Sequence, residues 1–258
     1  MAHILKIITD TIRHNEQNNF ANFNAETFPL AKRSAPLDVP GLIADTFFLI
    51  AEAKKGSPSK GIICEDFDPV ALARAYEAGG ASAVSVLTEQ EFFFGKKEYL
   101  TAVKQAVSLP VLRKDFIVHA YQVYESYNLG ADLVLLIAAC LDDHTLRHLH
   151  ALVRSLGMHA LIEVHDAEEI ARVLPLQPRL LGINNRDLKT FKVDLATSFE
   201  LIKMIPEDVY VISESGIATH EDIVSAQKNG FAGALVGESL LRHPDAKSAV
   251  QEILYGTN

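Results

Sequence analysis

The sequence contains no tryptophan and only two cysteines, Cys64 and Cys140, which lie far apart and in no CxxC spacing. This scarcity argues for a reducing compartment and against a structural zinc site. The chain also lacks an excess of cations, because 24 Lys and Arg stand against 33 Asp and Glu, for a net charge of −9. Nucleic acid is therefore not an expected partner, and an anionic ligand needs a local basic site.

Long hydrophobic runs are missing as well. The N-terminus has no apolar core of a signal peptide, and no run approaches the length of a membrane-spanning helix. We therefore expect a cytoplasmic protein with no membrane partner. What the chain does have is core material, since 48% of its 258 residues are hydrophobic and 22% are charged, at a length typical of a single α/β barrel.

The first part of the chain reads as a helical extension. Residues 4–20 are expected to be helical, with four isoleucines on one side: Ile4, Ile7, Ile8 and Ile12. Residues 22–45, with prolines at 29, 36 and 40, are expected to be an irregular lead-in with room for one short helix. We assign residues 1–258 to a single domain, with residues 1–45 as this extension and residues 46–258 as its main body.

That domain alternates apolar runs with helical patterns. The runs are 47–51, 83–87, 109–114, 132–137, 160–163, 180–184, 209–213 and 233–236. Helix signals lie between them, such as Asp68 before Pro69, a stop at Gly79-Gly80, and a capping box of Asp166 with Glu169. Repeats of roughly 20–35 residues without a break predict a (β/α)8 TIM barrel over a doubly wound sheet.

A barrel places its chemistry at the C-terminal ends of its strands. Lys54, Lys114, Glu163, Asn184 and Glu214 all follow apolar runs directly. Lys114 and Glu163 are the candidate acid–base pair, with apolar walls expected to lower the pKa of the lysine. The alternative is a structural ion pair that locks the barrel.

Several segments are suited to the two ends of a phosphorylated ligand. Gly216 and Gly237 follow the last two strands, where backbone amides often hold phosphate, although both glycines also suit plain turns. The loop 55–61 has cations, hydroxyls and glycine, which an ordinary loop has too. Phe93 and Phe116 follow the second and third strands and are candidates to enclose a flat ring. His144, His148 and His150 are assigned to a solvated helix face rather than to a metal.

These segments together resemble the indole-3-glycerol phosphate synthase family over nearly the whole chain. The resemblance is carried by IAEAK (50–54), SPSKG (57–61), SVLT (85–88) with Phe93, LRKDF (112–116), LIEVHD (161–166), GINNRDL (182–188), SESGI (213–217) and VGESL (236–240). It implies a (β/α)8 barrel with extra N-terminal helices. It also implies ring closure of 1-(2-carboxyphenylamino)-1-deoxyribulose 5-phosphate, with loss of carbon dioxide and water and with no metal or organic cofactor.

The resemblance assigns roles by position. Lys114 is implied as general acid and Glu163 as base or acid, with Glu52 and Lys54 in support. Asn184 and Ser215 complete the implied catalytic set. The implied substrate-binding residues are Ser57, Phe93, Phe116, Leu135, Arg186, Glu214, Gly216, Gly237 and Glu238. The partner is thus a small molecule, and we expect a monomer, although the sequence has no direct signal of the oligomeric state.

Two departures and two rival functions remain. Lys55-Gly56 stands where the family often has Arg-Ala, and Glu238 adds a negative side chain near the implied phosphate. One rival is a Schiff-base aldolase with Lys114 as nucleophile. The other is a non-catalytic binder of phosphorylated metabolites. The ionisable or amide groups at five strand ends argue against pure binding, because burying them without a catalytic role costs stability.

Overall fold

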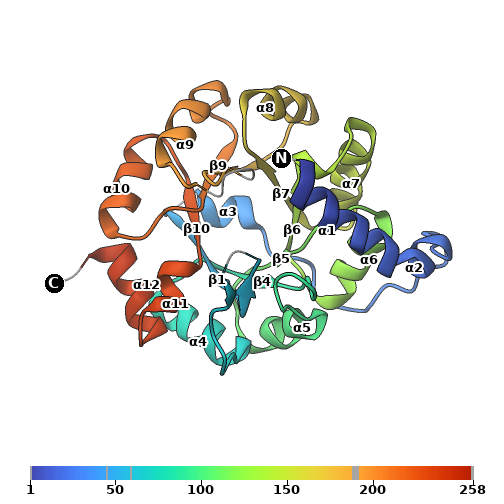
Figure 1. Ribbon diagram of the computed structural model, residues 1–258, viewed down its shortest axis with the longest axis horizontal. Coiled ribbons are helices and arrows are strands. Elements are labelled where there is room, and N and C mark those ends of the chain that lie inside the picture. Colours follow the sequence, from blue (N-terminus) through green and yellow to red (C-terminus); the bar gives the residue numbers. More distant parts are fainter. Residues whose placement is uncertain (1, 45, 59, 188–191, 257–258) are drawn as a thin grey trace.

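The computed structural model describes residues 2–44, 46–58, 60–187 and 192–256. In these residues eight parallel strands form a closed barrel in the order β1-β10-β9-β8-β7-β6-β5-β4, with helices around it (Figure 1). The strands are β1 Phe48–Ala53, β4 Ala83–Leu87, β5 Val111–Lys114, β6 Leu133–Ile137, β7 His159–Val164, β8 Leu180–Asn184, β9 Tyr210–Glu214 and β10 Gly233–Val236. The predicted (β/α)8 barrel is confirmed. Asp45, Ser59 and Leu188, which belong to the predicted boundary and motifs, lie outside the described residues.

The strands are mostly apolar because both of their faces are covered. Every residue of β1, β4, β6 and β10 is buried. Parallel pairing then brings the polar strand ends to one rim of the barrel. Leu87 pairs with Lys114, Ile137 with Glu163, and Asn184 with Glu214.

The outer helices begin and end where their sequences indicate. The helices after β1 are α4 Pro69–Gly79, α5 Lys97–Ala106, α6 Ala120–Leu129, α7 Asp143–Ser155, α8 Ala167–Val173, α9 Leu195–Leu201, α10 His220–Lys228, α11 Glu238–Arg242 and α12 Ala246–Tyr255, with 3₁₀ turns η1 Ala138–Cys140, η2 Leu174–Leu176 and η3 Ile202–Met204. Asp68 caps α4 by accepting from the backbone N–H of Val70 at 2.9 Å, and Gly80 ends it at φ 100°. On α7, His144 and His148 are exposed but His150 is buried, so its predicted solvated position is wrong.

The predicted capping box of α8 is only half formed. The Asp166 side chain accepts from the Glu169 backbone N–H at 2.9 Å, as expected. The Glu169 carboxylate, however, accepts from the backbone N–H of His165 at 2.8 Å, one residue before the expected donor. The first turn of α8 is thereby tied to the end of β7.

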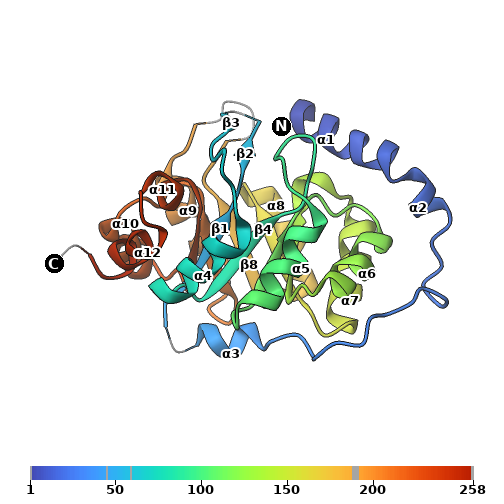
Figure 2. The same ribbon diagram turned by 90° about the horizontal axis from the view of Figure 1, so that it is seen from below.

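The N-terminal extension reaches both ends of the barrel. It comprises α1 Ala2–Asn15, α2 Gln17–Ala21 and, after a long connection, α3 Val39–Ile43. Figure 2 shows α1 at the end that also carries the hairpin of β2 Gly56–Ser57 and β3 Gly61–Ile62, and α3 at the opposite end. Ile8 and Ile12 are buried as predicted, but Ile7 is 39% exposed, because Leu5 takes the inward place on α1. No helix in the described ranges is long and apolar enough to cross a membrane.

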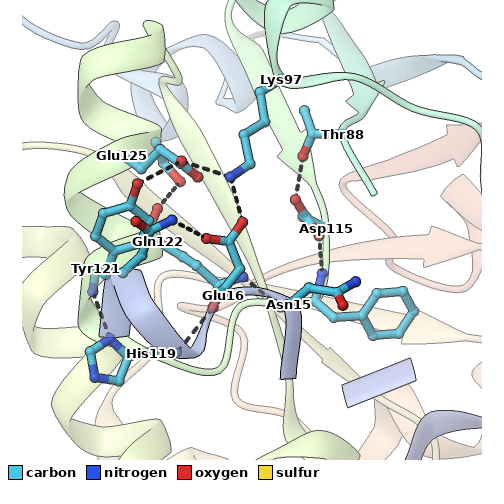
Figure 3. A network of polar contacts seen from close by, with 12 residues as sticks. Asn15, Glu16, Thr88, Lys97, Asp115, His119, Tyr121, Gln122 and Glu125 are labelled. Atoms are coloured by element: carbon cyan, nitrogen blue, oxygen red, sulfur yellow. Dashed lines mark hydrogen bonds and ion pairs between the residues drawn. The ribbon is translucent and has the colours of Figure 1, made fainter. Parts of the chain in front are cut away.

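A buried polar network holds β5 to the surrounding helices. The guanidinium of Arg113, which is 0% exposed, donates to Asp115 Oδ2 at 3.0 Å and to Ser126 Oγ at 3.1 Å, and forms an ion pair with Glu125 Oε2 at 2.8 Å. Figure 3 shows the surroundings of this network, where Lys97 extends it from Glu125 to Glu16 at the start of α2.

Candidate active site

A cavity of about 440 Å³ opens where the strands end. This volume suits a small organic ligand. Its lining includes fourteen of the fifteen residues predicted for the site, namely Glu52, Lys54, Ser57, Phe93, Lys114, Phe116, Glu163, Asn184, Arg186, Glu214, Ser215, Gly216, Gly237 and Glu238. The strand-end prediction therefore located the cavity correctly.

Leu135 is the exception. It is 1% exposed within β6 and does not belong to the cavity lining, so its predicted place in the aryl pocket is wrong. Ile137, two residues further along the same strand, lines the cavity instead. Residues two apart on a strand point to the same face, so the side chains of Leu135 and Ile137 both point inward. Ile137 lies closer to the end of the strand and therefore reaches the rim of the cavity.

Lys114 and Glu163 meet in this cavity. The Lys114 ammonium donates to Glu163 Oε2 at 3.2 Å and lies 3.7 Å from Glu214 Oε2. The Lys114 side chain is 16% exposed, whereas those of Glu163 and Glu214 are 4% and 2% exposed. A cation at the rim thus faces two carboxyl groups deeper in the wall.

The second lysine has a carboxylate of its own. Lys54 Nζ lies 2.7 Å from Glu52 Oε1, and both side chains come from the end of β1. Two glycines leave room for the carboxyl groups around them. A Cβ atom at Gly237 would lie 2.7 Å from Glu52 Oε1, and one at Gly182 would lie 2.0 Å from Glu214 Oε1. A side chain at Gly237 would therefore displace the Glu52 carboxylate from its present position.

These contacts set the protonation states of the site. Burial lowers the pKa of Lys114, but Glu163, Glu214 and Glu52 outweigh burial and hold it above its usual value. The predicted lowering by apolar walls is therefore wrong in sign. Burial raises the pKa of Glu163, but Lys114 and His165 outweigh burial and hold it below its usual value.

Glu214 behaves in the opposite way. Burial, reinforced by the charge of Glu163, raises the pKa of Glu214 to about 8. Its Oε1 atom is buried and makes no hydrogen bond within the described part of the chain. The site at neutral pH therefore combines an ammonium at Lys114, a carboxylate at Glu163 and a carboxyl at Glu214 that holds a proton.

An amide and a hydroxyl connect this cluster to the β8 and β9 ends. Asn184 Nδ2 donates to Glu163 Oε1 at 3.2 Å, and Ser215 Oγ donates to Asn184 Oδ1 at 2.9 Å. Ser215 has a left-handed backbone with φ 64°, and Gly216 follows at φ 96°. Asn185 supports the turn by donating to the backbone oxygen of Ser215 at 3.0 Å. Asn184 lines the cavity and also accepts from the backbone N–H of Arg186 at 3.0 Å, so both asparagines hold the strand ends in place.

The far rim carries the groups expected near a phosphate. Gly216, Gly237 and Ser57 line it together with Arg242 of α11, which the sequence analysis missed. The Glu238 carboxylate pairs with the Lys60 ammonium and lies 2.6 Å from Arg242 Nη2. Its negative charge is therefore matched by two cations.

The opposite side of the cavity is apolar. The Phe93 and Phe116 rings lie 6.0 Å apart between centroids and are tilted by 42°. Ile4, Leu5 and Ile8 of α1 complete this wall. The isoleucine pattern predicted the helix α1 but not its place at the cavity, because an amphipathic pattern indicates which face of a helix is buried and not which segment covers that face.

The described residues contain no group of three or more His, Cys, Asp or Glu arranged to hold a metal ion.

Known proteins resemble this chain over most of its length. The family model described as "Indole-3-glycerol phosphate synthase" matches residues 2–253. The protein of that name from Zymomonas mobilis subsp. pomaceae is 47% identical over 208 residues, which cover 81% of this chain and 79% of the relative. That from Desulforamulus reducens is 51% identical over 207 residues, with 80% and 78% covered.

A solved structure titled "Crystal Structure of 3-Hexulose-6-Phosphate Synthase" aligns with a TM-score of 0.64 at 16% identity, covering 82% of this chain and 100% of that one. At this identity the likeness concerns the barrel fold alone. The family model spans nearly the whole chain, and the two sequence relatives are about half identical to it over about four fifths of its length. On this evidence the chain belongs to the indole-3-glycerol phosphate synthase family.

Proposed function

We propose that the chain closes the indole ring of 1-(2-carboxyphenylamino)-1-deoxyribulose 5-phosphate, with release of carbon dioxide and water. The observation that carries this proposal is the meeting of Lys114, Glu163 and Glu214 beneath a cavity with an apolar wall on one side and cations on the other. Such a cavity matches a substrate that has an aryl carboxylate at one end and a phosphate at the other.

Lys114 acts as general acid in the ring closure. The aromatic carbon that bears the carboxylate attacks the ketone carbon, and Lys114 gives a proton to the ketone oxygen, which becomes a hydroxyl. Attack interrupts the aromatic system, so protonation during attack lowers the barrier. The raised pKa keeps the proton on Lys114 until the oxygen gains negative charge. A charged ammonium is no nucleophile, which argues against a Schiff base at this lysine.

Loss of carbon dioxide then restores the aromatic ring, and loss of water completes the indole. The departing hydroxyl takes up a proton and the neighbouring carbon loses one, so this step needs an acid and a base. Glu163, held as a carboxylate, is suited to be the base. Glu52 and Lys54, paired at 2.7 Å, stand beside it, with Glu52 positioning Lys114 and assisting dehydration.

The remaining lining residues bind the substrate. Asn184, Ser215, Arg186 and the protonated Glu214 offer hydrogen bonds to the hydroxylated linker. Ser57 and the backbone of Gly216, Gly237 and Glu238 hold the phosphate, and Lys54 faces the substrate carboxylate. Phe93, Phe116 and Ile137 enclose the aryl ring.

Substitution of Lys114 tests this proposal. Lys114→Ala is expected to lower kcat by at least about a hundredfold, because a general acid is removed. Product is followed by carbon dioxide release and by the indole chromophore, without added metal. Lys203→Ala, at an exposed lysine of η3, is the matched control and should keep full turnover. Near-normal turnover in a folded Lys114→Ala protein would refute the assignment.

A further inference from the structure

His165 lies behind the catalytic carboxylate rather than in the cavity. It follows β7 directly, its side chain is 6% exposed, and it does not belong to the cavity lining. Its Nε2 atom lies 3.3 Å from Glu163 Oε1, and its Nδ1 atom lies 3.2 Å from Glu169 Oε2. We propose that His165 is a positioning residue, an imidazolium that holds Glu163 ionised and oriented throughout the reaction.

The positions of the two nitrogens carry this proposal. A neutral imidazole has one N–H and one bare nitrogen, whose lone pair would lie beside a carboxylate oxygen. With a carboxylate beside each nitrogen, only the doubly protonated ring avoids that repulsion. The charge states agree, since burial lowers the pKa of His165 but Glu163 and Glu169 outweigh burial and raise it to about 10.

Glu169 fixes the ring from the outer side. The Glu169 side chain is 7% exposed, and its Oε2 atom also accepts from the backbone N–H of His165 at 2.8 Å. Because Asp166 caps α8 through the backbone N–H of Glu169, the position of the ring is set by the first turn of that helix. The half-formed capping box thus fixes the Glu169 carboxylate in the position where it contacts His165.

On the inner side the contact is electrostatic. His165 Nε2 lies at ion-pair distance from Glu163 but makes no aligned hydrogen bond within the described residues. The amide of Asn184 occupies the same Glu163 oxygen at 3.2 Å. Glu163 can therefore rotate slightly towards a substrate without losing the attraction of the ring, because an ion pair depends on distance more than on angle.

The other ionisable groups near the His165 ring do not neutralise its positive charge. Cys140 of η1 lies in the field of the same two carboxylates, and burial together with their charge raises the pKa of its thiol to about 12. Lys114 faces Glu163 from across the cavity. Two cations therefore flank one carboxylate, one on the substrate side and one on the wall side.

This arrangement has a consequence for the proposed reaction, on which the inference rests. When Lys114 gives its proton to the ketone, Glu163 loses its substrate-side cation. Without a second cation, a buried carboxylate would then take up a proton and cease to be a base. His165 remains charged at that moment and keeps Glu163 ionised for the later proton transfer.

The experiment compares two buried histidines. His165→Asn removes the cation at similar size and polarity, and His150→Asn is the matched control, since His150 is 6% exposed on α7 and has a lowered pKa because of burial. For His165→Asn we expect kcat to fall about tenfold at neutral pH, KM to change less than about twofold, and the acidic limb of the kcat profile to move up by about one pH unit. The control should keep the wild-type profile.

A uniform fall of kcat with an unmoved acidic limb would show a merely structural role and overturn the proposal. A second measurement needs no turnover: ¹⁵N NMR of the wild-type histidine rings, with His165 assigned by its loss in the variant or by selective labelling. Both nitrogens of His165 should remain protonated up to about pH 9, and a neutral ring at pH 8 would overturn the proposal. Because this readout is independent of product, it also separates a failure of this inference from a failure of the proposed function.

Discussion

Arg113 and Lys114 are neighbours on β5 and point in opposite directions, Arg113 towards α6 and Lys114 into the cavity. Both are cations that face more than one carboxyl group, Arg113 fully buried and Lys114 partly exposed at the cavity. The Arg113 guanidinium donates to Thr88 at 3.2 Å, to the Gln122 backbone oxygen at 3.1 Å and to Ser126 and Asp115 as well, so all of its nitrogens have partners. Lys114 donates to one carboxylate and stays 3.7 Å from the next.

The difference separates a structural network from a chemical one. A network in which every donor nitrogen has a partner stabilises one arrangement and leaves no donor for a ligand. At the cavity, by contrast, the Lys114 ammonium donates to Glu163 and the buried Glu214 Oε1 has no hydrogen bond among the described residues. Polar groups left in this state are costly to the fold, and a substrate can satisfy them.

The largest expected effect on stability is at Arg113. Arg113→Met leaves Asp115 and Glu125 buried without their common cation, which should lower the free energy of unfolding by about 3–5 kcal/mol. Lys114→Met should cost less, because Lys54 and His165 remain beside the same carboxyl groups and the cavity admits water. Chemical denaturation of both variants measures the two costs.

Turnover should show the reverse order. The Arg113→Met protein, assayed under conditions where it stays folded, should keep more activity than Lys114→Met, in which the proposed general acid is missing. If both variants lost the same free energy of unfolding and the same turnover, the two faces of β5 would not differ in the way described.

At Glu214 a substitution is expected to raise the stability of the protein, in contrast to the losses expected at Arg113 and Lys114. Its folded pKa of about 8 lies above the ordinary 4.5, so the folded protein binds this proton more tightly than the unfolded chain does. Its contribution is therefore most favourable below about pH 4.5 and is lost as the pH rises through 8. Glu214→Gln has no such loss and should gain stability relative to wild type over that range, reaching about 1–3 kcal/mol at pH 8.

Denaturation at pH 5 and pH 8 checks this prediction, and turnover should fall in the same variant. A stability difference that does not change with pH would mean that Glu214 is ionised in the folded protein from the start. Asp208→Asn, at an exposed carboxylate in the loop before β9, serves as control.

The sequence alone predicted the barrel and most of the cavity, because strand ends are defined by where apolar runs stop. The predictions failed where the surroundings of a residue are formed by segments that are distant in the sequence. The direction of the Lys114 pKa follows from three carboxyl groups on three other strands, which no local pattern reveals. The place of Leu5 and the exposure of Ile7 depend on how α1 docks. His165 was part of a matching segment, yet its role depends on Glu169 of α8.

The smallest expected effect lies at the edge of the Arg113 network, at Lys97. This lysine is 25% exposed and bridges Glu16 at 2.7 Å and Glu125 at 2.8 Å, as Figure 3 shows. Lys97→Met should lower the free energy of unfolding by only about 0.5–1 kcal/mol, because water reaches the pair and Glu125 keeps Arg113 at 2.8 Å. Added salt should lower the free energy of unfolding of the wild type towards that of the variant, because it screens the ion pairs. A loss as large as that of Arg113→Met would mean that the network is stabilised through its connection to α2, and not through the buried guanidinium.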